Sequence, residues 1–341
     1  MKNKKILLAN SLLVLALLLF VSMPYLAIKI LRLKTPISGN VSLLLSGGAS
    51  IIVLGGIALL YCRITKRRFA KVMVIKKISV KQVMLIMMLA IGTYIFAIGI
   101  NSLSMKLFPV AIKDSMAISS LLNNSSTVLG LFVVIFVPAF FEEVFFRGIF
   151  LDAYEGINKK IKYFIIIVIF ATFHGNIMQI MYVLFLGLIL LKVREYTGSL
   201  LGSMTLHATN NAISFILSKV ALNYMKLMDT GIDNGVIDPA KAAATAETMN
   251  VSMSVVLLRA SIAFLIGGAI LFIYLRKLKE YKEEKEDLEY IEEEKNTMGT
   301  EYDLGDKYIL RDEKNTHTDK VKYVPLAIYF VAITALVVLR Y

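Results

Sequence analysis

Hydrophobic residues run through this chain in long stretches, which short clusters of charged and turn-forming residues separate. A helix of about 20 apolar residues crosses a hydrocarbon layer of roughly 30 Å and satisfies its own backbone hydrogen bonds. The stretches that match this pattern are 6–28, 41–62, 83–105, 128–150, 199–220, 255–275 and the shorter 324–339. The pattern predicts an all-α membrane protein, a polytopic helical bundle.

One further apolar stretch, 163–191, decides the topology. Its 29 residues carry no formal charge, and His174, Gly175 and Asn176 interrupt it. It is too long for one crossing and slightly short for two, at about 1.5 Å of rise per residue. The sequence therefore leaves one crossing or a helical hairpin, and a total of eight to nine transmembrane helices.

The distribution of Lys and Arg separates these two topologies. With a cytoplasmic N-terminus and a hairpin, the inner short segments carry sixteen Lys and Arg, whereas the outer ones carry seven. A single crossing would move Arg276, Lys277 and Lys279 to the outside. The positive-inside rule thus favours the hairpin, with its turn near Gly175, in an integral multi-pass protein. In a prokaryote the membrane would be the plasma membrane.

Composition agrees with a lipid environment. Hydrophobic residues make up 57% of the 341 residues, more than a soluble core of that length requires. The net charge of +13 comes from Lys and Arg that flank apolar stretches, so we expect membrane lipid and no nucleic acid as a partner. The single cysteine, Cys62, excludes an intrachain disulfide framework and a cysteine metal cluster.

Polar residues of chemical interest gather between residues 142 and 211. Glu142, Glu143 and Arg147 lie in an otherwise apolar helix, where each costs about 2.5–3.5 kcal/mol when central and unpaired. Glu143 and Arg147 are four residues apart and can pair, while Glu142 points about 100° away and stays available. The alternative is a structural ion pair with one spare acid near the interface.

Two histidines complete the candidate cluster. His174 follows Phe170 at four-residue spacing, and His207 shares a helix face with Asn211, for which Asn210 is an alternative. Counted from the inner ends of their helices, Glu142, His174 and His207 lie roughly 20, 18 and 14 Å deep. We expect one cluster in the inner half of the membrane, which water reaches from the cytoplasm.

These motifs resemble a known family. Glu-Glu-x-x-x-Arg (142–147), Phe-x-x-x-His (170–174) and His-x-x-x-Asn (207–211) stand on successive helices. In this order they resemble the CAAX protease and bacteriocin-processing family of intramembrane endopeptidases, which is related to type II CAAX prenyl endopeptidases. The resemblance covers about residues 127–217.

The resemblance implies a role for each motif residue. Glu142 with His174 would activate a water for attack on a peptide carbonyl, and His207 with Asn211 would stabilise the oxyanion. The supporting residues would be Glu143, Arg147, Asn210 and Phe170, with the Glu143–Arg147 pair holding the helix register.

A metal is the open alternative. Glu142, His174 and His207 could also form a three-ligand Zn²⁺ site with an open position for water. The chain has no His-Glu-x-x-His pair, and we expect the metal-free glutamate mechanism, with no cofactor.

The sequence leaves three functions open. The favoured one is a protease that cuts a membrane-associated or lipidated peptide near the cytoplasmic face. The second is a non-proteolytic immunity or regulatory protein that binds a partner. The third is a transporter or channel that uses Glu142 and Glu143, which the lack of an inverted repeat disfavours.

The expected parts of the chain follow from these predictions. The first helix lacks a small-x-small cleavage site, so we expect it to stay attached. The parts are 1–126, three transmembrane helices and a basic cytoplasmic loop; 127–220, the CAAX-protease-like catalytic core; 221–253, an extracytoplasmic loop with a short helix at Asp238-Pro239; 254–275, a transmembrane helix; 276–323, a charged cytoplasmic segment that first prolongs that helix; and 324–341, a C-terminal transmembrane helix.

Overall fold

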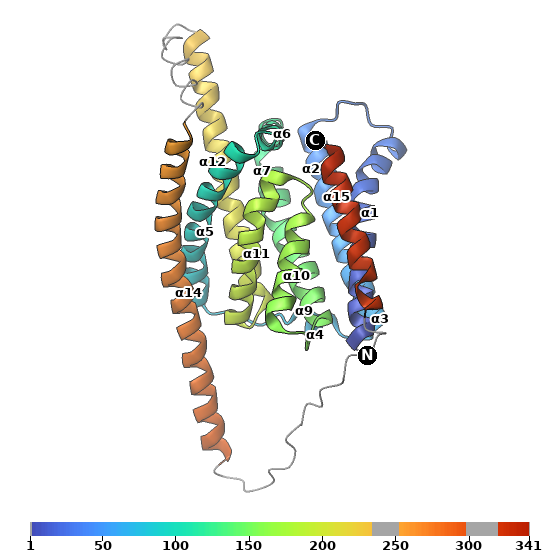
Figure 1. Cartoon of the computed structure of the whole chain (residues 1–341), viewed down its shortest axis with the longest axis vertical. Helices are drawn as coiled ribbons and strands as arrows, with labels where there is room; N and C mark the ends of the chain where they lie inside the picture. Colours follow the sequence, from blue (N-terminus) through green and yellow to red (C-terminus); the bar gives the residue numbers. More distant parts are fainter. Residues whose placement is uncertain (1, 234–251, 298–319, 341) are drawn as a thin grey trace.

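The computed structural model describes residues 2–233, 252–297 and 320–340, and within these ranges it contains helices and no strand (Figure 1). Among the described residues, seven helices are long and apolar enough to cross a membrane. They are 3–30, 39–65, 80–107, 127–153, 177–197, 253–289 and 321–340. The prediction of an all-α polytopic membrane protein is confirmed. The sequence predicted eight to nine transmembrane helices, whereas seven helices in the described part of the chain meet this length and hydropathy requirement.

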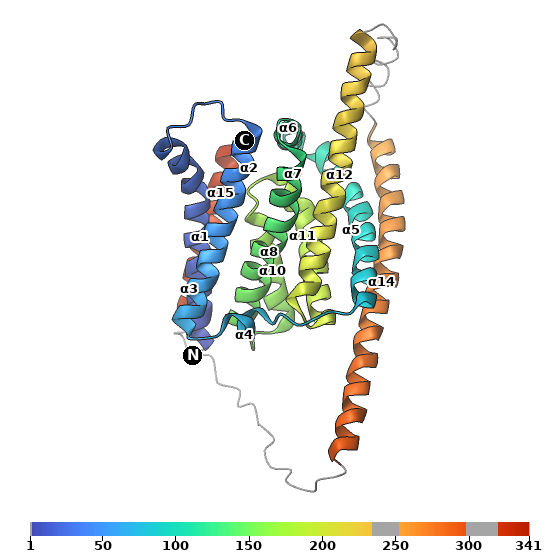
Figure 2. The same cartoon turned by 180° about the vertical axis from the view of Figure 1, so that it is seen from behind.

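The two ends of the chain pack together on one side of the bundle. Helix α1 (Lys2–Ile30) lies against α15 (Val324–Arg340), as Figures 1 and 2 show. Asn10 of α1 donates a hydrogen bond of 2.8 Å to the carbonyl of Lys322. Tyr329 of α15 is fully buried against the middle of the bundle. The C-terminal helix is therefore part of the core assembly.

The second transmembrane rod belongs to the same side. It consists of α2 (Gly39–Ala49), the π-helical turn η1 (Ser50–Gly55) and α3 (Gly56–Thr65), and it contacts α1. After a short helix, α4 (Phe69–Met73), the chain crosses to the far side of the bundle.

The far side consists of α5 (Val80–Leu107) and α14 (Met253–Thr297), which pack along their length. Their close approach depends on Gly92 and Gly99, because a Cβ atom at either would come within 2.6 Å of a side chain of α14. The long apolar stretch of α14 is thus held beside α5 rather than beside the candidate cluster.

The middle of the bundle starts with a single rod that contains two π-helical segments. Its segments are α7 (Thr127–Gly130), η2 (Leu131–Phe136), α8 (Val137–Glu142), η3 (Glu143–Ile149) and α9 (Phe150–Ala153), of which η2 and η3 are π-helical. Such π-helical turns occur frequently at functional sites. Here the boundary between α8 and η3 falls between the two glutamates.

The predicted hairpin is present. Helix α10 (Lys159–Thr172) and helix α11 (Ile177–Thr197) run antiparallel, with 14 and 21 residues. Gly175 turns the chain at a φ of +64°, a left-handed conformation that favours glycine, and Asn176 caps α11. The two arms are unequal, which explains how 29 apolar residues form both.

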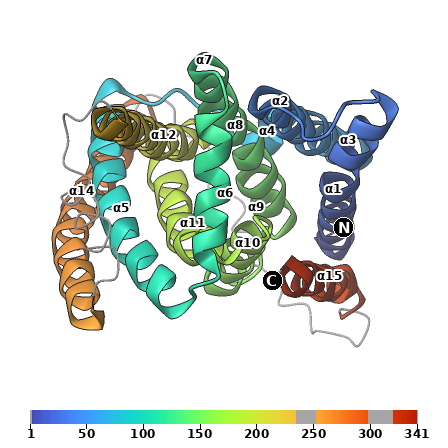
Figure 3. The ribbon, with the colours of Figure 1, turned by 90° about the horizontal axis from the view of Figure 1, so that it is seen from above.

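Helix α12 (Leu200–Asp233) completes the middle of the bundle, and α6 (Ala111–Asn123) lies across one end of it (Figure 3). Asp114 at the start of α6 accepts hydrogen bonds of 2.7 and 3.0 Å from Arg340. Lys219 donates to the carbonyls of Leu122 and Ser125 at the other end of α6. The sequence did not predict α6, because its mixture of serine, charged and apolar residues is also typical of a connecting segment.

The two ends of the bundle differ. The N-terminus, α4 and the charged half of α14 lie at one end, whereas α6 lies at the opposite end (Figures 1 and 2). As predicted, the charged segment after residue 275 begins as a continuation of the preceding helix. The predicted short helix at Asp238-Pro239 lies outside the described residues.

Candidate active site

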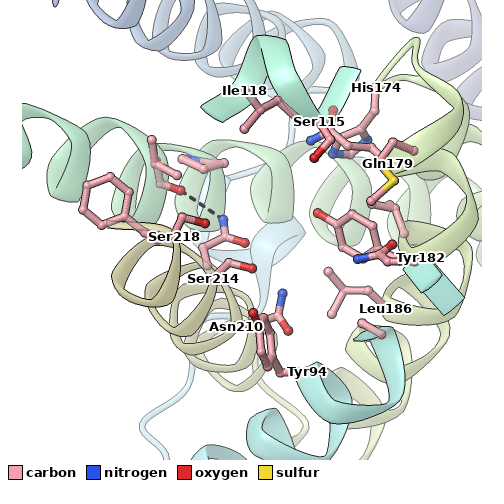
Figure 4. A pocket seen from close by; sticks show the side chains of 18 of the residues that line it. Tyr94, Ser115, Ile118, His174, Gln179, Tyr182, Leu186, Asn210, Ser214 and Ser218 are labelled. Atoms are coloured by element: carbon pink, nitrogen blue, oxygen red, sulfur yellow. Dashed lines mark hydrogen bonds between the residues drawn. The ribbon is translucent and has the colours of Figure 1, made fainter. Parts of the chain in front are cut away.

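The candidate residues converge on one cavity of about 450 Å³ in the middle of the bundle. Side chains from α5, α6, α8, the hairpin and α12 line it (Figure 4). Those that the sequence singled out are Glu142, Phe170, His174, His207, Asn210 and Asn211. The other two, Glu143 and Arg147, lie directly behind this lining and are fully buried.

Glu143 connects the rod to α12. Its Oε1 atom lies 3.0 Å from Nη1 of Arg147 and 3.0 Å from Nδ1 of His207. A carboxylate only accepts hydrogen bonds, so the Nδ1–H group of His207 donates and its Nε2 atom is left free. The predicted Glu143–Arg147 pair is therefore present, and it also orients His207, which the sequence did not predict.

Phe170 packs between the charged pair and the two histidines. The guanidinium carbon of Arg147 lies 3.9 Å from the centre of the Phe170 ring. The same ring meets His174 edge-on at a centroid distance of 5.3 Å and His207 at 6.0 Å. A stacked aromatic face stabilises a desolvated guanidinium, so Phe170 supports the cluster by packing.

Glu142 is the carboxylate that faces the cavity. Its side chain keeps 18% exposure, and its Oε2 atom lies 3.9 Å from Nε2 of His207. That oxygen has no hydrogen-bond partner among the described residues. Glu142 thus differs from its neighbour Glu143, because one carboxylate is committed to protein contacts and the other is available.

His174 lies at the start of the hairpin turn. Its Nδ1 atom lies 3.0 Å from the carbonyl oxygen of Phe170, which can only accept, so Nδ1–H donates and Nε2 is free. Just before it, Thr172 is 3.0 Å from the hydroxyl of Tyr329. Both imidazoles are therefore fixed through Nδ1 and leave Nε2 for the cavity.

The two asparagines of α12 differ in their contacts. Asn211 donates a hydrogen bond of 3.1 Å from Nδ2 to the carbonyl of Val134 in η2. Asn210 is 4% exposed, and its Oδ1 atom has no partner among the described residues. The structure brings both to the cavity, with Asn211 anchored to the backbone.

The site also bears on the zinc alternative. Two imidazoles held through Nδ1, with Nε2 free, and one carboxylate are donor types that suit Zn²⁺. In the described part of the chain, however, no three His, Cys, Asp or Glu side chains form a group with the spacing of a metal site. The donor types therefore fit Zn²⁺, whereas the present arrangement of these side chains does not.

The cavity extends toward α6. Its lining includes Ser218 of α12 and Ser115 of α6, the helix at the end of the bundle opposite the N-terminus (Figure 1). Toward the N-terminal end, Phe145, Phe146 and Phe150 are fully buried. The sequence predicted access from the cytoplasmic, N-terminal side. That prediction was based on the depth of each residue along its helix. Depth does not show on which side of the cluster the side chains leave open space.

Other lining residues had weaker signals in the sequence. Asn101 is an amide within an apolar stretch, and Gln179 and Tyr182 follow the hairpin turn at three-residue spacing. Each is an isolated polar residue in a transmembrane segment, which is by itself a pointer to function. Because the sequence did not predict α6, nothing in it connected these residues to Glu142.

The fold and the site together define a class: a polytopic helical membrane protein with a buried cluster of acid, imidazole and amide groups around a cavity. Residues 124–213 match the family model described as type II CAAX prenyl endopeptidase Rce1-like. The match contains all three motifs, 142–147, 170–174 and 207–211, so this segment carries a domain of the CAAX protease family. No curated protein and no solved structure matches the chain.

Proposed function

We propose that the chain is an intramembrane endopeptidase of the CAAX-protease type. The observation that carries the proposal is the position of Glu142, whose Oε2 atom has no hydrogen-bond partner among the described residues and lies 3.9 Å from Nε2 of His207, in a cavity that His174 also lines. A carboxylate in such a position is suited to act as a general base.

The proposed reaction is the hydrolysis of a peptide bond. Glu142, helped by His174, takes a proton from a water molecule while the water oxygen attacks the carbonyl carbon. Nε2–H of a protonated His207, together with the amide of Asn210 or Asn211, donates to the oxyanion. The C–N bond then breaks, and Glu142 returns the proton to the leaving amine. Fixed donors of this kind are worth about 3–4 kcal/mol each in the transition state.

Glu143 and Arg147 act as positioning residues in this proposal. The Glu143 carboxylate accepts the Nδ1–H group of His207 and so fixes its ring, and Arg147 balances the charge of Glu143. Neither lines the cavity.

We also propose that the N-terminus is cytoplasmic. The basic residues around α4 and those that flank the hairpin lie at the N-terminal end of the bundle (Figure 1). This arrangement agrees with the positive-inside rule. The cavity, which extends toward α6, would then receive its substrate from the other side.

Glu142→Gln tests the proposed function, since it removes the base and keeps the shape of the side chain. We expect the loss of about 10²–10⁴-fold in turnover that the removal of a general base causes. Membrane peptides from cells with the wild-type chain and with Glu142→Gln would be compared by mass spectrometry. Glu155→Gln, at a largely exposed carboxylate, is the matched control. Identical peptides in all three samples would favour a non-proteolytic binding protein.

Removal of zinc tests the mechanism. We expect the purified protein to keep full activity after dialysis against a strong chelator. Loss of activity that Zn²⁺ restores would instead support a zinc site formed by Glu142, His174 and His207.

A further inference from the structure

The wall of the cavity between the cluster and α6 is polar. On α12, Ser214 and Ser218 continue the face that begins with Asn210, at four-residue spacing. On α6, Ser115 and Ser119 repeat that spacing and line the same cavity. Figure 4 shows Ser115, Ser214 and Ser218 around one opening. Two stripes of hydroxyl and amide groups therefore face the space next to Glu142.

Some of these polar groups lack a partner. Oδ1 of Asn101, Oδ1 of Asn210 and Oε2 of Glu142 are all buried, and none has a hydrogen-bond partner among the described residues. Buried acceptors are destabilising until a donor reaches them. A peptide in an extended conformation presents backbone N–H donors at regular intervals, whereas a prenyl chain presents none.

The polar stripe on α12 also limits the length of peptide that can lie beside it. From Asn210 to Ser218 is eight residues, or about 12 Å along a helix axis. An extended peptide advances about 3.3 Å per residue, so three to four residues fit beside the stripe. Apolar residues such as Ile98 and Leu186 line other parts of the wall and can hold the side chains of those residues.

We infer that this cavity binds an unlipidated peptide segment in an extended conformation, with Asn101 as a substrate-binding residue outside the three motifs. The inference rests on the proposed endopeptidase function and gives its substrate class. A prenyl chain in the same place would cover serine hydroxyls and amide oxygens with hydrocarbon and leave them without partners. Asn101 and Asn210 accept backbone N–H groups of the segment, which runs from the cluster toward α6.

Peptide libraries test the substrate class. The full chain, reconstituted in lipid nanodiscs, would be given a randomised eight-residue library with one fixed cysteine, either unmodified or S-farnesylated. We expect the unmodified library to be cleaved at least about tenfold faster, because the farnesyl chain would cover hydroxyl and amide groups of the cavity wall without donating hydrogen bonds to them. Equal or faster cleavage of the farnesylated library would overturn the inference and leave the proposed function standing. Cleavage of neither library would refute both.

Asn101→Leu tests the proposed binding residue. For an unmodified peptide selected from the library, we expect KM to rise about tenfold with little change in kcat, because Asn101 contacts substrate away from the scissile bond. Ser102→Leu is the matched control, since Ser102 donates to the carbonyl of Ile98 and does not line the cavity. An unchanged KM in Asn101→Leu would overturn the assignment. If Asn101→Leu does not fold, Asn101→Ala replaces it.

Discussion

The chain uses the same ion-pair spacing in two opposite environments. In η3, Glu143 and Arg147 are four residues apart and both side chains are completely buried. On the part of α14 beyond the apolar stretch, four pairs with this spacing are all partly exposed to solvent. They are Arg276–Glu280, Lys279–Glu283, Lys282–Glu286 and Lys285–Glu289.

The comparison shows that spacing alone does not set the value of an ion pair. Water screens the pairs on α14, and such pairs contribute about 0.3–0.5 kcal/mol each. The buried pair has lost its hydration, so removal of one partner leaves a charge with nothing to balance it, at a cost of about 3–5 kcal/mol. The four exposed pairs keep this part of α14 soluble, whereas the buried pair fixes the position of His207.

The largest expected effect is that of Glu143→Gln. The change leaves the guanidinium of Arg147 buried without its counter-ion and weakens the hold on His207, so we expect a loss of about 3–5 kcal/mol in stability. Thermal unfolding in detergent would measure it, and peptide cleavage should fall as well. Adding Arg147→Met should restore much of the Tm and none of the cleavage. If Glu143→Gln alone had the same Tm as the wild type, the buried pair would not contribute the expected stability.

Arg147→Lys should have a smaller effect, because a positive charge remains beside Glu143. The ammonium group lacks the flat face that stacks on Phe170, and we expect a loss of about 1–2 kcal/mol. The same unfolding assay would detect it. A drop as large as that of Glu143→Gln would show that the geometry of the guanidinium matters more than its charge.

Tyr329→Phe tests a neutral contact next to the same cluster. The hydroxyl of Tyr329 lies 3.0 Å from Thr172 and donates to the carbonyl of Ile169 at 3.2 Å, just before His174. Loss of these hydrogen bonds should cost about 1 kcal/mol. We expect a modest fall in Tm together with a lower kcat. Phe330→Leu, one residue further on α15, is the control that should leave kcat unchanged.

The smallest expected effect is that of a change in one of the exposed ion pairs on α14. Glu283→Gln removes the partner of Lys279, and we expect a change of no more than about 0.5 kcal/mol. High salt should abolish even that difference, because it screens exposed charges. Unfolding at low and high ionic strength would measure the effect. A change comparable with that of Arg147→Lys would mean that this face of α14 is covered.

Much of the bundle could be predicted from the sequence. Apolar stretches of sufficient length specified the transmembrane helices, and Gly175 in an uncharged stretch specified the hairpin. The pairing of Glu143 with Arg147 followed from four-residue spacing, and it is present. These features are local, since they depend on residues close together in one helix or on the length of one stretch.

Three features of the site could not be predicted. The bond from Glu143 to His207 joins residues 64 positions apart. Helix α6 owes its position to Asp114 and Arg340 at one end and Lys219 at the other, contacts between distant parts of the chain. The direction in which the cavity extends depends on which side chains fill the core, and Phe145, Phe146 and Phe150 are fully buried toward the end of the bundle that carries the N-terminus.

The sequence by itself determined the lipid environment, the order of the long apolar helices, and the types of polar residue that must lie among them. Hydrophobic length and the cost of unpaired charge in lipid are properties of single segments, so they can be read in one dimension. Only the tertiary structure decided which glutamate is committed to protein contacts and which faces open space. That choice depends on which helices pack against each face of the rod, and packing partners are not encoded in any one segment.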